Sequence, residues 1–364
     1  MNTEIMHRID IPVKNLHQLA KQIRQWGAEL GFQQIGITDT SLGKEEQYLT
    51  AWLQKKYHGK MSYMEKHGSK RSRPEELVPG TVRVISLRMN YMPEMCADSN
   101  DILDNQDLAF ISRYALGRDY HKVIRNRLKK LAAKIKKEVE TFGYRIFVDS
   151  APVLEKAFAA KSGLGWVGKH TNLINKVHGS WFFLGELYTN LPLPLDVKME
   201  KNLCGTCKAC IDVCPTNAIV APYELDARKC ISYLTIELKS SIPEKYRTAI
   251  GNRIFGCDDC QLVCPWNKYA KKTTLSDFMV RDKLDRTTLV KLFSWNKEIF
   301  LKRTEGSAIR RVGYEGWLRN IAVALGNAPS TENVIGALQN KVNHKSEIVR
   351  EHVLWALEKH ITRD

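Results

Sequence analysis

The chain has 364 residues, enough for two or three domains, and carries 56 Lys and Arg against 40 Asp and Glu, a formal net charge of +16. Hydrophobic residues make up 43% and charged residues 26%, a balance that excludes a disordered protein. No apolar run reaches the ~20 residues that cross a membrane, and the charged N-terminus does not resemble an export signal. We therefore expect a cytoplasmic protein with no membrane partner and with charge suited to a polyanion.

The first half of the chain alternates between helical and strand patterns. Intervals of three and four between apolar residues predict helices, and short apolar runs bounded by turn residues predict strands. In chain order these are a helix at 15–31, a strand at 32–38, a helix at 45–57, a strand at 82–89, a helix at 118–140, a strand at 144–149, a helix ending near 162 and a strand at 181–188. This alternation predicts an α/β or α+β domain over residues 1–200.

The predicted helix at 118–140 is strongly basic. Nine Lys or Arg occur between 118 and 137, and Asp119 is the one acid there. Such a helix either presents a solvated outer face or faces phosphates, and the sequence leaves both interpretations open.

Two acidic positions could carry chemistry. Asp149 ends a predicted strand, where an acid could transfer a proton, although it could instead cap the following helix. Asp119-Tyr120-His121 invites a metal or catalytic interpretation, although a histidine at a helix start is more often structural. The cobalamin signature Asp-x-His-x-x-Gly is not matched, because Ile124 occupies the glycine position. Three glycines between 163 and 168 predict a close backbone approach, but they follow a helix and so do not support a Rossmann site.

The cysteines carry the strongest signal. Eight of nine lie between 204 and 264, in Cys204-x-x-Cys207-x-x-Cys210-x-x-x-Cys214-Pro and Cys257-x-x-Cys260-x-x-x-Cys264-Pro, with Cys230 upstream. The first run has the spacing of bacterial ferredoxins, in which the fourth cysteine binds the other cluster. We therefore predict one [4Fe–4S] cluster on Cys204, Cys207, Cys210 and Cys264, and a second on Cys214, Cys230, Cys257 and Cys260. Structural zinc is the alternative.

The insertion within the second motif and the tail of the chain also have distinct patterns. The 26 residues between Cys230 and Cys257 interrupt the second motif, so we expect this insertion to be a functional element. Residues 201–270 are predicted to form the ferredoxin-like domain. The tail at 285–364 is rich in helix formers, and its paired apolar stripes resemble HEAT-type helical repeats.

Several strings, taken in order, resemble epoxyqueuosine reductases. They are Arg113-Tyr-Ala-Leu-Gly-Arg-Asp-Tyr-His121, Val148-Asp-Ser-Ala-Pro152, Gly163-Leu-Gly-Trp-Val-Gly-Lys169, Gly251-Asn-Arg-Ile-Phe-Gly-Cys-Asp-Asp-Cys260 and the tail from Gly306. The resemblance implies an α+β chain with an α/β cobalamin-binding domain, a double-cluster domain and HEAT-like helices. It implies reduction of the epoxide of epoxyqueuosine to queuosine at the tRNA wobble position, with base-off cobalamin and two [4Fe–4S] clusters.

The resemblance also implies roles for particular residues. Asp149 matches the family's proton donor, for which we expect burial beside the corrin to raise the pKa. We expect a monomer that receives electrons from a donor the sequence does not identify. Positions expected to line cobalamin are Arg71, Ser112, Asp149, Leu173, Leu184, Ser232 and Asp258; candidate tRNA phosphate contacts are Arg310, Arg311 and Arg319.

Two other functions remain open from the sequence. A reductive dehalogenase-like enzyme would share the cobalamin and cluster plan, but the missing export signal and the basic tail argue against it. A non-catalytic iron–sulfur electron carrier or RNA-binding protein would explain the clusters and the charge, but not an N-terminal domain of this size.

Overall fold

A four-stranded sheet organises the N-terminal half of the computed structural model, which describes residues 13–149, 151–196 and 201–362. The strand order is β1 (Gln34–Thr38), β2 (Arg83–Asn90), β7 (Phe182–Thr189), β4 (Tyr144–Phe147). Every neighbouring pair is antiparallel, so the α/β description of this region is wrong and α+β is right. Alternation of helices and strands does not fix strand direction, because β7 enters between β2 and β4 from far along the chain.

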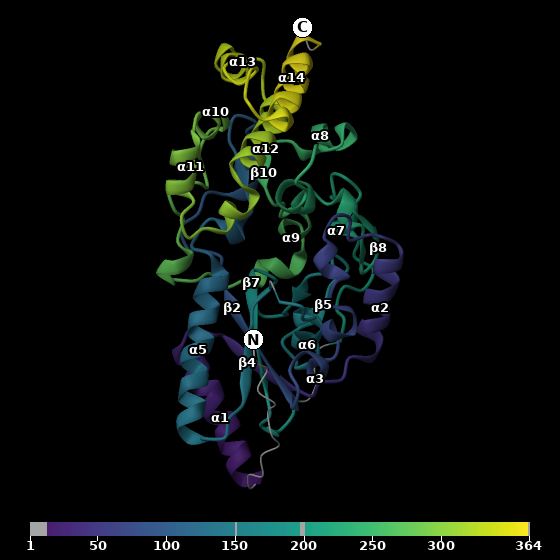
Figure 1. Ribbon diagram of the computed structural model, residues 1–364, viewed down its shortest axis with the longest axis vertical. Coiled ribbons are helices and arrows are strands. Elements are labelled where there is room, and N and C mark those ends of the chain that lie inside the picture. The colour runs from purple at the N-terminus through teal and green to yellow at the C-terminus, as the bar shows by residue number, and fades with distance from the viewer. Residues whose placement is uncertain (1–12, 150, 197–200, 363–364) are drawn as a thin grey trace.

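Helices cover both faces of this sheet (Figure 1). The amphipathic helices α1 (Val13–Glu29) and α5 (Tyr120–Glu138) pack together on one face, where Ile23 and Ile124 are fully buried against strand residues. The short α6 (Glu155–Lys161) lies on the other face and buries Phe158. The helices and strands predicted from periodicity are thus confirmed within a few residues at their ends.

The glycine-rich segment after α6 approaches a neighbouring backbone. It forms β5 (Trp166–Val167), which pairs with β6 (Leu173–Ile174). A Cβ on Gly165 would lie 2.1 Å from the backbone oxygen of Ile174, so only glycine fits there. This confirms the predicted close approach, and its partner is another segment of the chain.

The cysteine-rich region contains short elements and the predicted insertion. Its helices α7 (Ala209–Asp212) and α9 (Asp259–Leu262) contact each other, and β8 (Ile219–Ala221) pairs with β9 (Glu224–Leu225). The insertion holds a π-helical turn (Tyr233–Glu237), α8 (Glu244–Ile250) and β10 (Arg253–Phe255), which pairs with β3 (Phe110–Ile111). The insertion is therefore tied to the N-terminal half by a strand pair.

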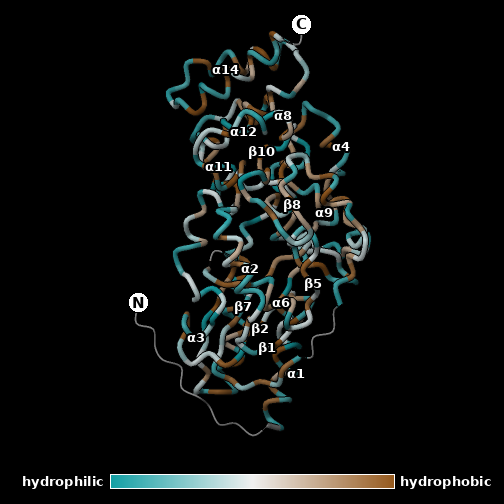
Figure 2. The backbone as a smooth tube through the Cα atoms, turned by 90° about the vertical axis from the view of Figure 1, so that its right-hand side faces the viewer, coloured by the Kyte–Doolittle hydropathy of each residue, from teal (hydrophilic) through white to brown (hydrophobic). Residues whose placement is uncertain are grey.

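The C-terminal tail is helical, as predicted. Buried α12 (Tyr314–Asn327) packs against α14 (Glu347–Ile361) and also against β10 and α8, so the tail shares a core with the insertion. Figure 1 shows these helices at the end of the elongated molecule opposite α1, and in Figure 2 hydrophobic segments run through its interior. The remaining helices are α2 (Gly43–Gln54), α3 (Pro74–Leu77), α4 (Ser99–Asp104), α10 (Leu289–Phe293), α11 (Lys297–Arg303) and α13 (Glu332–Gln339).

Short 3-10 turns connect many of these elements. They lie at Ser62–Met64, Gly68–Arg71, Arg113–Ala115, Ala227–Lys229, Pro265–Tyr269, Ser276–Phe278 and Ala308–Val312. Within the described part of the chain, no helix has the length and apolar character needed to cross a membrane. Residues 1–12, which bear on the predicted absence of an export signal, lie outside the described residues.

Candidate functional site

A large cavity of about 600 Å³ lies where three regions of the chain meet. Asp149, from the loop after β4, and His121, from the start of α5, line one side. Cys230 and Ser232 bring the insertion to the cavity, and Arg311 contributes from the tail. The predicted position of Asp149 at a strand end beside a binding crevice is confirmed.

Asp149 is held by side chains from the first turn of α5. Its Oδ2 accepts hydrogen bonds from the Tyr120 hydroxyl at 2.5 Å and from Nε2 of His121 at 3.1 Å. The other ring nitrogen of His121 lies 2.7 Å from Oδ1 of Asp119, which caps α5. Asp149 itself adopts a left-handed backbone (φ 42°), and Leu154 occupies the N-cap position of α6. The helix-cap interpretation of Asp149 is therefore wrong.

This network decides where protons reside. Burial, which would raise the pKa of Asp149, is outweighed by the hydrogen bonds from His121 and Tyr120, so that pKa is lowered. Burial alone would lower the pKa of His121, but its bonds to Asp119 and Asp149 raise it to about 9. The pKa rise expected from burial beside a corrin stays a prediction; within this network the pKa of Asp149 is lowered and that of His121 is raised.

A smaller cavity of about 190 Å³ adjoins the first and shares Tyr114, Tyr120 and Lys156 with it. Leu173 and Leu184 line this second cavity, as does Glu155. Tyr120 is fixed between them because its ring stacks on Phe183, with centroids 4.1 Å apart, and on His121 at the same separation. The two cavities together form a space with both aromatic and ionisable walls.

Ser112 and Asp258 form a buried pair behind this space. The Ser112 hydroxyl donates to Oδ1 of Asp258 at 2.6 Å, and the backbone N–H of Arg113 donates to Oδ2 at 2.8 Å. Both side chains are about 2% exposed, and neither is among the described residues that line the two cavities. The pair therefore joins the cysteine loop to the N-terminal half.

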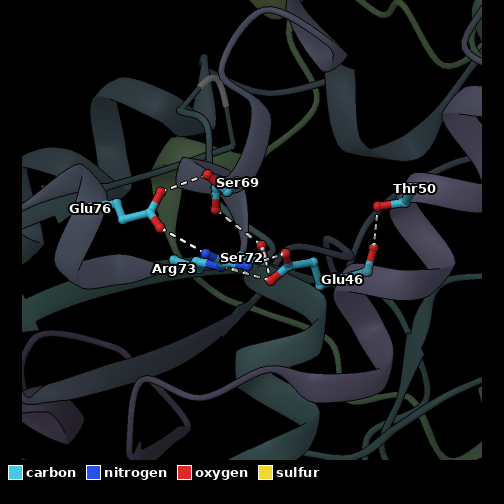
Figure 3. Close-up of polar contacts among 6 residues, drawn as sticks. All are labelled: Glu46, Thr50, Ser69, Ser72, Arg73 and Glu76. Atoms are coloured by element: carbon cyan, nitrogen blue, oxygen red, sulfur yellow. Dashed lines mark hydrogen bonds and ion pairs between the residues drawn. The ribbon is translucent and has the colours of Figure 1, made fainter.

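Arg71 is also buried, in a turn beside α2. Its guanidinium donates to the backbone oxygens of Met64 and Tyr63, at 3.1 and 2.6 Å. In Figure 3, Ser72 and Arg73 from this region donate to the carboxylate of Glu46 and so tie the turn to α2. The other contacts drawn there, by Thr50, Ser69 and Glu76, lie within α2 or within residues 69–76. Among the described residues, those lining the two cavities do not include Arg71, and its visible role is to shape the 61–65 loop, whose Met61 does line the larger one.

Electrostatic interactions link the eight cysteines in two sets that match those expected from their spacing, and the ligand assignment itself stays a prediction. Cys210 and Cys264 lie close enough to Cys204 and Cys207 to interact electrostatically with them. Cys207 is exposed, and the loop that carries it is braced by Lys169, whose Nζ donates to the backbone oxygens of Gly205 and Cys207 at 2.6 and 2.9 Å. This group lies at the protein surface.

Each cysteine of the second group is half-buried. Cys230 interacts electrostatically with Cys214, Cys257 and Cys260, so the insertion brings its cysteine back to the other three. Cys260 also interacts with Cys210 of the first group, so the groups are adjacent. Since Cys230 lines the large cavity, this group lies between the surface group and Asp149.

The three tail arginines have different surroundings. Arg310 and Arg311 line the large cavity, and Arg311 forms an ion pair with Glu237 at 2.8 Å. Arg319 is fully buried and donates to the backbone oxygens of Leu238, Ser240 and Leu234 at 2.6 to 2.9 Å. Its assignment as a tRNA contact is wrong, because α12 points this side chain into the interior.

Sequence reasoning missed two acids near Asp149. Glu155 accepts a hydrogen bond from the backbone N–H of Asp149 at 3.2 Å, and Glu186 is 1% exposed in β7. The signal for Glu186 was an acid within the apolar run Trp-Phe-Phe-Leu-Gly-Glu-Leu-Tyr. The signal for His121 was its place beside two further polar side chains, but the fold was needed to bring it to Asp149.

Comparison with known proteins identifies the family. A family model for epoxyqueuosine reductase QueG, DUF1730, matches residues 71–150, and one for a 4Fe-4S double cluster binding domain matches 203–267, which contain all eight cysteines. The epoxyqueuosine reductase of Pseudomonas aeruginosa is 59% identical over 345 residues, covering 94% of this chain and 95% of that protein. The chain belongs to the epoxyqueuosine reductase family. It is therefore an oxidoreductase with a double-cluster domain, and the zinc alternative is wrong.

Other relatives agree with this assignment. The Escherichia coli epoxyqueuosine reductase is 56% identical over 349 residues, covering 96% of this chain and 91% of that protein. A crystal structure of epoxyqueuosine reductase with a tRNA-Tyr epoxyqueuosine-modified stem loop has a TM-score of 0.88 and 26% identity, covering 95% of this chain and 91% of that one. The Bacillus subtilis enzyme, solved with its catalytic aspartate loop swung out of the active site, has a TM-score of 0.84 and 26% identity, with the same coverage.

Proposed function

We propose that this protein reduces the epoxide of epoxyqueuosine at the wobble position of tRNA, with cobalamin held in the two adjoining cavities and electrons relayed through two [4Fe–4S] clusters. The observation that carries the proposal is the arrangement of the large cavity, which has Asp149 with His121 on one side and Cys230 on another. Proton-bearing groups and a cluster ligand thus face the same space.

The eight thiols suit the two clusters. The surface cluster would be held by Cys204, Cys207, Cys210 and Cys264. The second cluster, beside the large cavity, would be held by Cys214, Cys230, Cys257 and Cys260. Only cysteines make up each group, which is the donor set that iron–sulfur cubes prefer. Exposure of Cys207 and the place of Cys230 on the cavity wall support entry of electrons at the first cluster and exit at the second.

The cavity walls suit a corrin. Leu173 and Leu184 offer apolar contacts, Tyr114 and Tyr120 offer aromatic faces, and Ser232 offers a hydroxyl beside Cys230. When bound, base-off cobalamin would supply a strongly reducing cobalt centre. Ser112, Asp258 and Arg71 would act indirectly, since they support the loops that line this space.

Asp149 would deliver a proton to the oxygen of the opening epoxide. An alkoxide is a poor leaving group, and protonation of the developing oxyanion lowers that barrier. The pKa of His121, raised to about 9, favours a proton on its ring at neutral pH, and its Nε2 is 3.1 Å from Oδ2 of Asp149, so Asp149 would pass that proton on. The catalytic aspartate loop of the Bacillus subtilis enzyme supports this role.

The tRNA partner is supported by the related structure with a modified tRNA stem loop. Arg310 and Arg311 are exposed residues that line the large cavity, and they would contact phosphates beside the inserted base. The basic residues of α5 are further candidates for backbone contacts.

Reconstitution tests the proposal. Purified protein carrying both clusters should bind a corrinoid, visible as a change in its absorbance spectrum, and should then convert epoxyqueuosine in tRNA when given an artificial reductant. Protein that holds both clusters but never binds a corrinoid would contradict it.

A further inference from the structure

Three carboxyl groups follow one another from the cavity into the interior. Asp149 lines the large cavity and Glu155 lines the smaller one. Oε2 of Glu155 accepts the backbone N–H of Asp149 at 3.2 Å. Glu186, on the sheet below, interacts electrostatically with Glu155 and is 1% exposed.

Glu186 lacks the partners that a buried carboxylate needs. Its Oε1 lies 3.4 Å from the Ser86 hydroxyl, and its buried Oε2 has no hydrogen-bond partner among the described residues. An ionised carboxylate is strongly disfavoured in such surroundings, whereas the neutral acid is tolerated. Burial, and then the charge of Glu155, accordingly hold the pKa of Glu186 well above its ordinary value.

Glu155 is placed to exchange its proton near neutral pH. Burial and then the neighbouring Asp149 raise the pKa of Glu155 to about 7, and Lys156 and His121 oppose that rise. The titratable or charged groups that face it are Asp149, His121, Lys156, Glu186, Tyr120 and Tyr188. Glu155 is thus a half-buried carboxyl on the wall of the smaller cavity, with a pKa raised to about 7.

The reaction needs more than one proton. Conversion of an epoxide to an alkene breaks both carbon–oxygen bonds, takes up two electrons and two protons, and releases the oxygen as water. The electrons come from the reductant through the clusters. Asp149 can hand over one proton at a time, and His121 holds one for it. A second proton source, either solvent or a neighbouring acid, must therefore supply Asp149, whose side chain is 45% exposed.

We propose that Glu155, which lies next to the neutral Glu186, is that source. It is a positioning residue that holds the Asp149 backbone, and it supplies the second proton through the Asp149 carboxyl. This inference rests on the proposed function. Glu155 acts from behind Asp149, while the substrate would meet Asp149 from the cavity side.

The variant that tests this is Glu155→Gln. Its amide oxygen can still accept the Asp149 N–H, but it has no proton to give. In single-turnover reduction of an epoxyqueuosine-modified tRNA stem loop, we expect the variant to be slower by about 10²-fold at neutral pH, the lower end of what a positioned proton donor contributes. We also expect it to lose the fall in rate that the wild type shows as pH rises through about 7. The control, Glu138→Gln, changes an exposed residue at the end of α5 and should match the wild type. A Glu155→Gln profile that overlays the wild type would overturn the proposal.

A second readout does not depend on turnover. In the cofactor-free protein labelled at glutamate side-chain carboxyl carbons, NMR should show one signal that titrates near pH 7. That signal should be absent from Glu155→Gln and present in Glu138→Gln. A wild-type spectrum without it would overturn the role of Glu155 even if the enzyme is active. Failure of the wild type to reduce the substrate would instead refute the proposed function.

Discussion

The two walls of the large cavity differ in origin and in chemistry. The acid wall, Asp119, Tyr120, His121 and Asp149, comes from α5 and the loop after β4. The cysteine wall, Cys230, Ser232, Tyr233 and Ile236, comes from the insertion that interrupts the second cysteine motif. Under the proposed function, the acid wall would supply protons and the cysteine wall would deliver electrons, so the reaction would take place where the two walls meet.

Removal of the acid wall's central carboxyl should have the largest effect. Asp149→Asn keeps the shape of the side chain but removes its capacity to pass a proton, so we expect turnover to fall by about 10² to 10⁴-fold. Both clusters and corrinoid binding should survive, as measured by absorbance and metal analysis. The exposed Asp104→Asn should be neutral, and full activity of Asp149→Asn would disprove the acid role.

The cysteine wall should fail in a different way. Cys230→Ala removes one ligand of the cluster beside the large cavity. Iron content should therefore fall by roughly half and turnover should also fall, while the surface cluster remains. Iron and sulfide analysis with electron paramagnetic resonance measures this. Cys96→Ala, at the one cysteine outside the motif, is the matched control and should keep all its iron. Retention of both clusters in Cys230→Ala would disprove the ligand assignment.

The acid wall should also set a pH limit. The pKa of His121 is raised to about 9, so its proton is present below that pH and is lost as pH rises through it. Wild-type turnover should therefore show a falling limb near pH 9, in addition to the one assigned to Glu155. In His121→Gln that limb should vanish and the rate at neutral pH should drop roughly tenfold, less than for Asp149→Asn because Tyr120 remains. An unchanged limb would show that another group controls it.

Substitutions of the tail arginines should have the smallest effect on turnover, and they distinguish a surface arginine from a buried one. Arg310→Gln should weaken tRNA binding uniformly and reduce the slope of log affinity against log salt by about 1. Arg319→Gln should leave tRNA affinity unchanged but destabilise the fold by about 3–5 kcal/mol, because three backbone oxygens lose a buried charged donor. Filter binding and denaturant unfolding measure the two effects. The opposite pattern would reverse the two assignments.

Local patterns predicted the cysteine wall better than the acid wall. Cysteine spacing specifies ligand partners directly, so the grouping of Cys230 with Cys214, Cys257 and Cys260 was accessible from the sequence, as were most helices and strands. Strand direction was not, because it depends on β7 entering between β2 and β4.

Long-range contacts also explain what the sequence left open around Asp149. Its proton balance depends on His121, Glu155 and Glu186, which lie on three different elements. Arg319 shows the converse case: a basic residue in a basic tail suggested the surface, but α12 is buried on all sides over residues 317–326, so Arg319 lies inside.

The most direct test of the account is analysis of the product nucleosides. Protein loaded with both clusters and cobalamin is incubated with epoxyqueuosine-modified tRNA and a reductant, and the digested nucleosides are measured by mass spectrometry. We expect the modified nucleoside to lose one oxygen with the wild type and to remain unchanged with Asp149→Asn. Persistence of the epoxide with fully loaded wild-type protein would contradict the account.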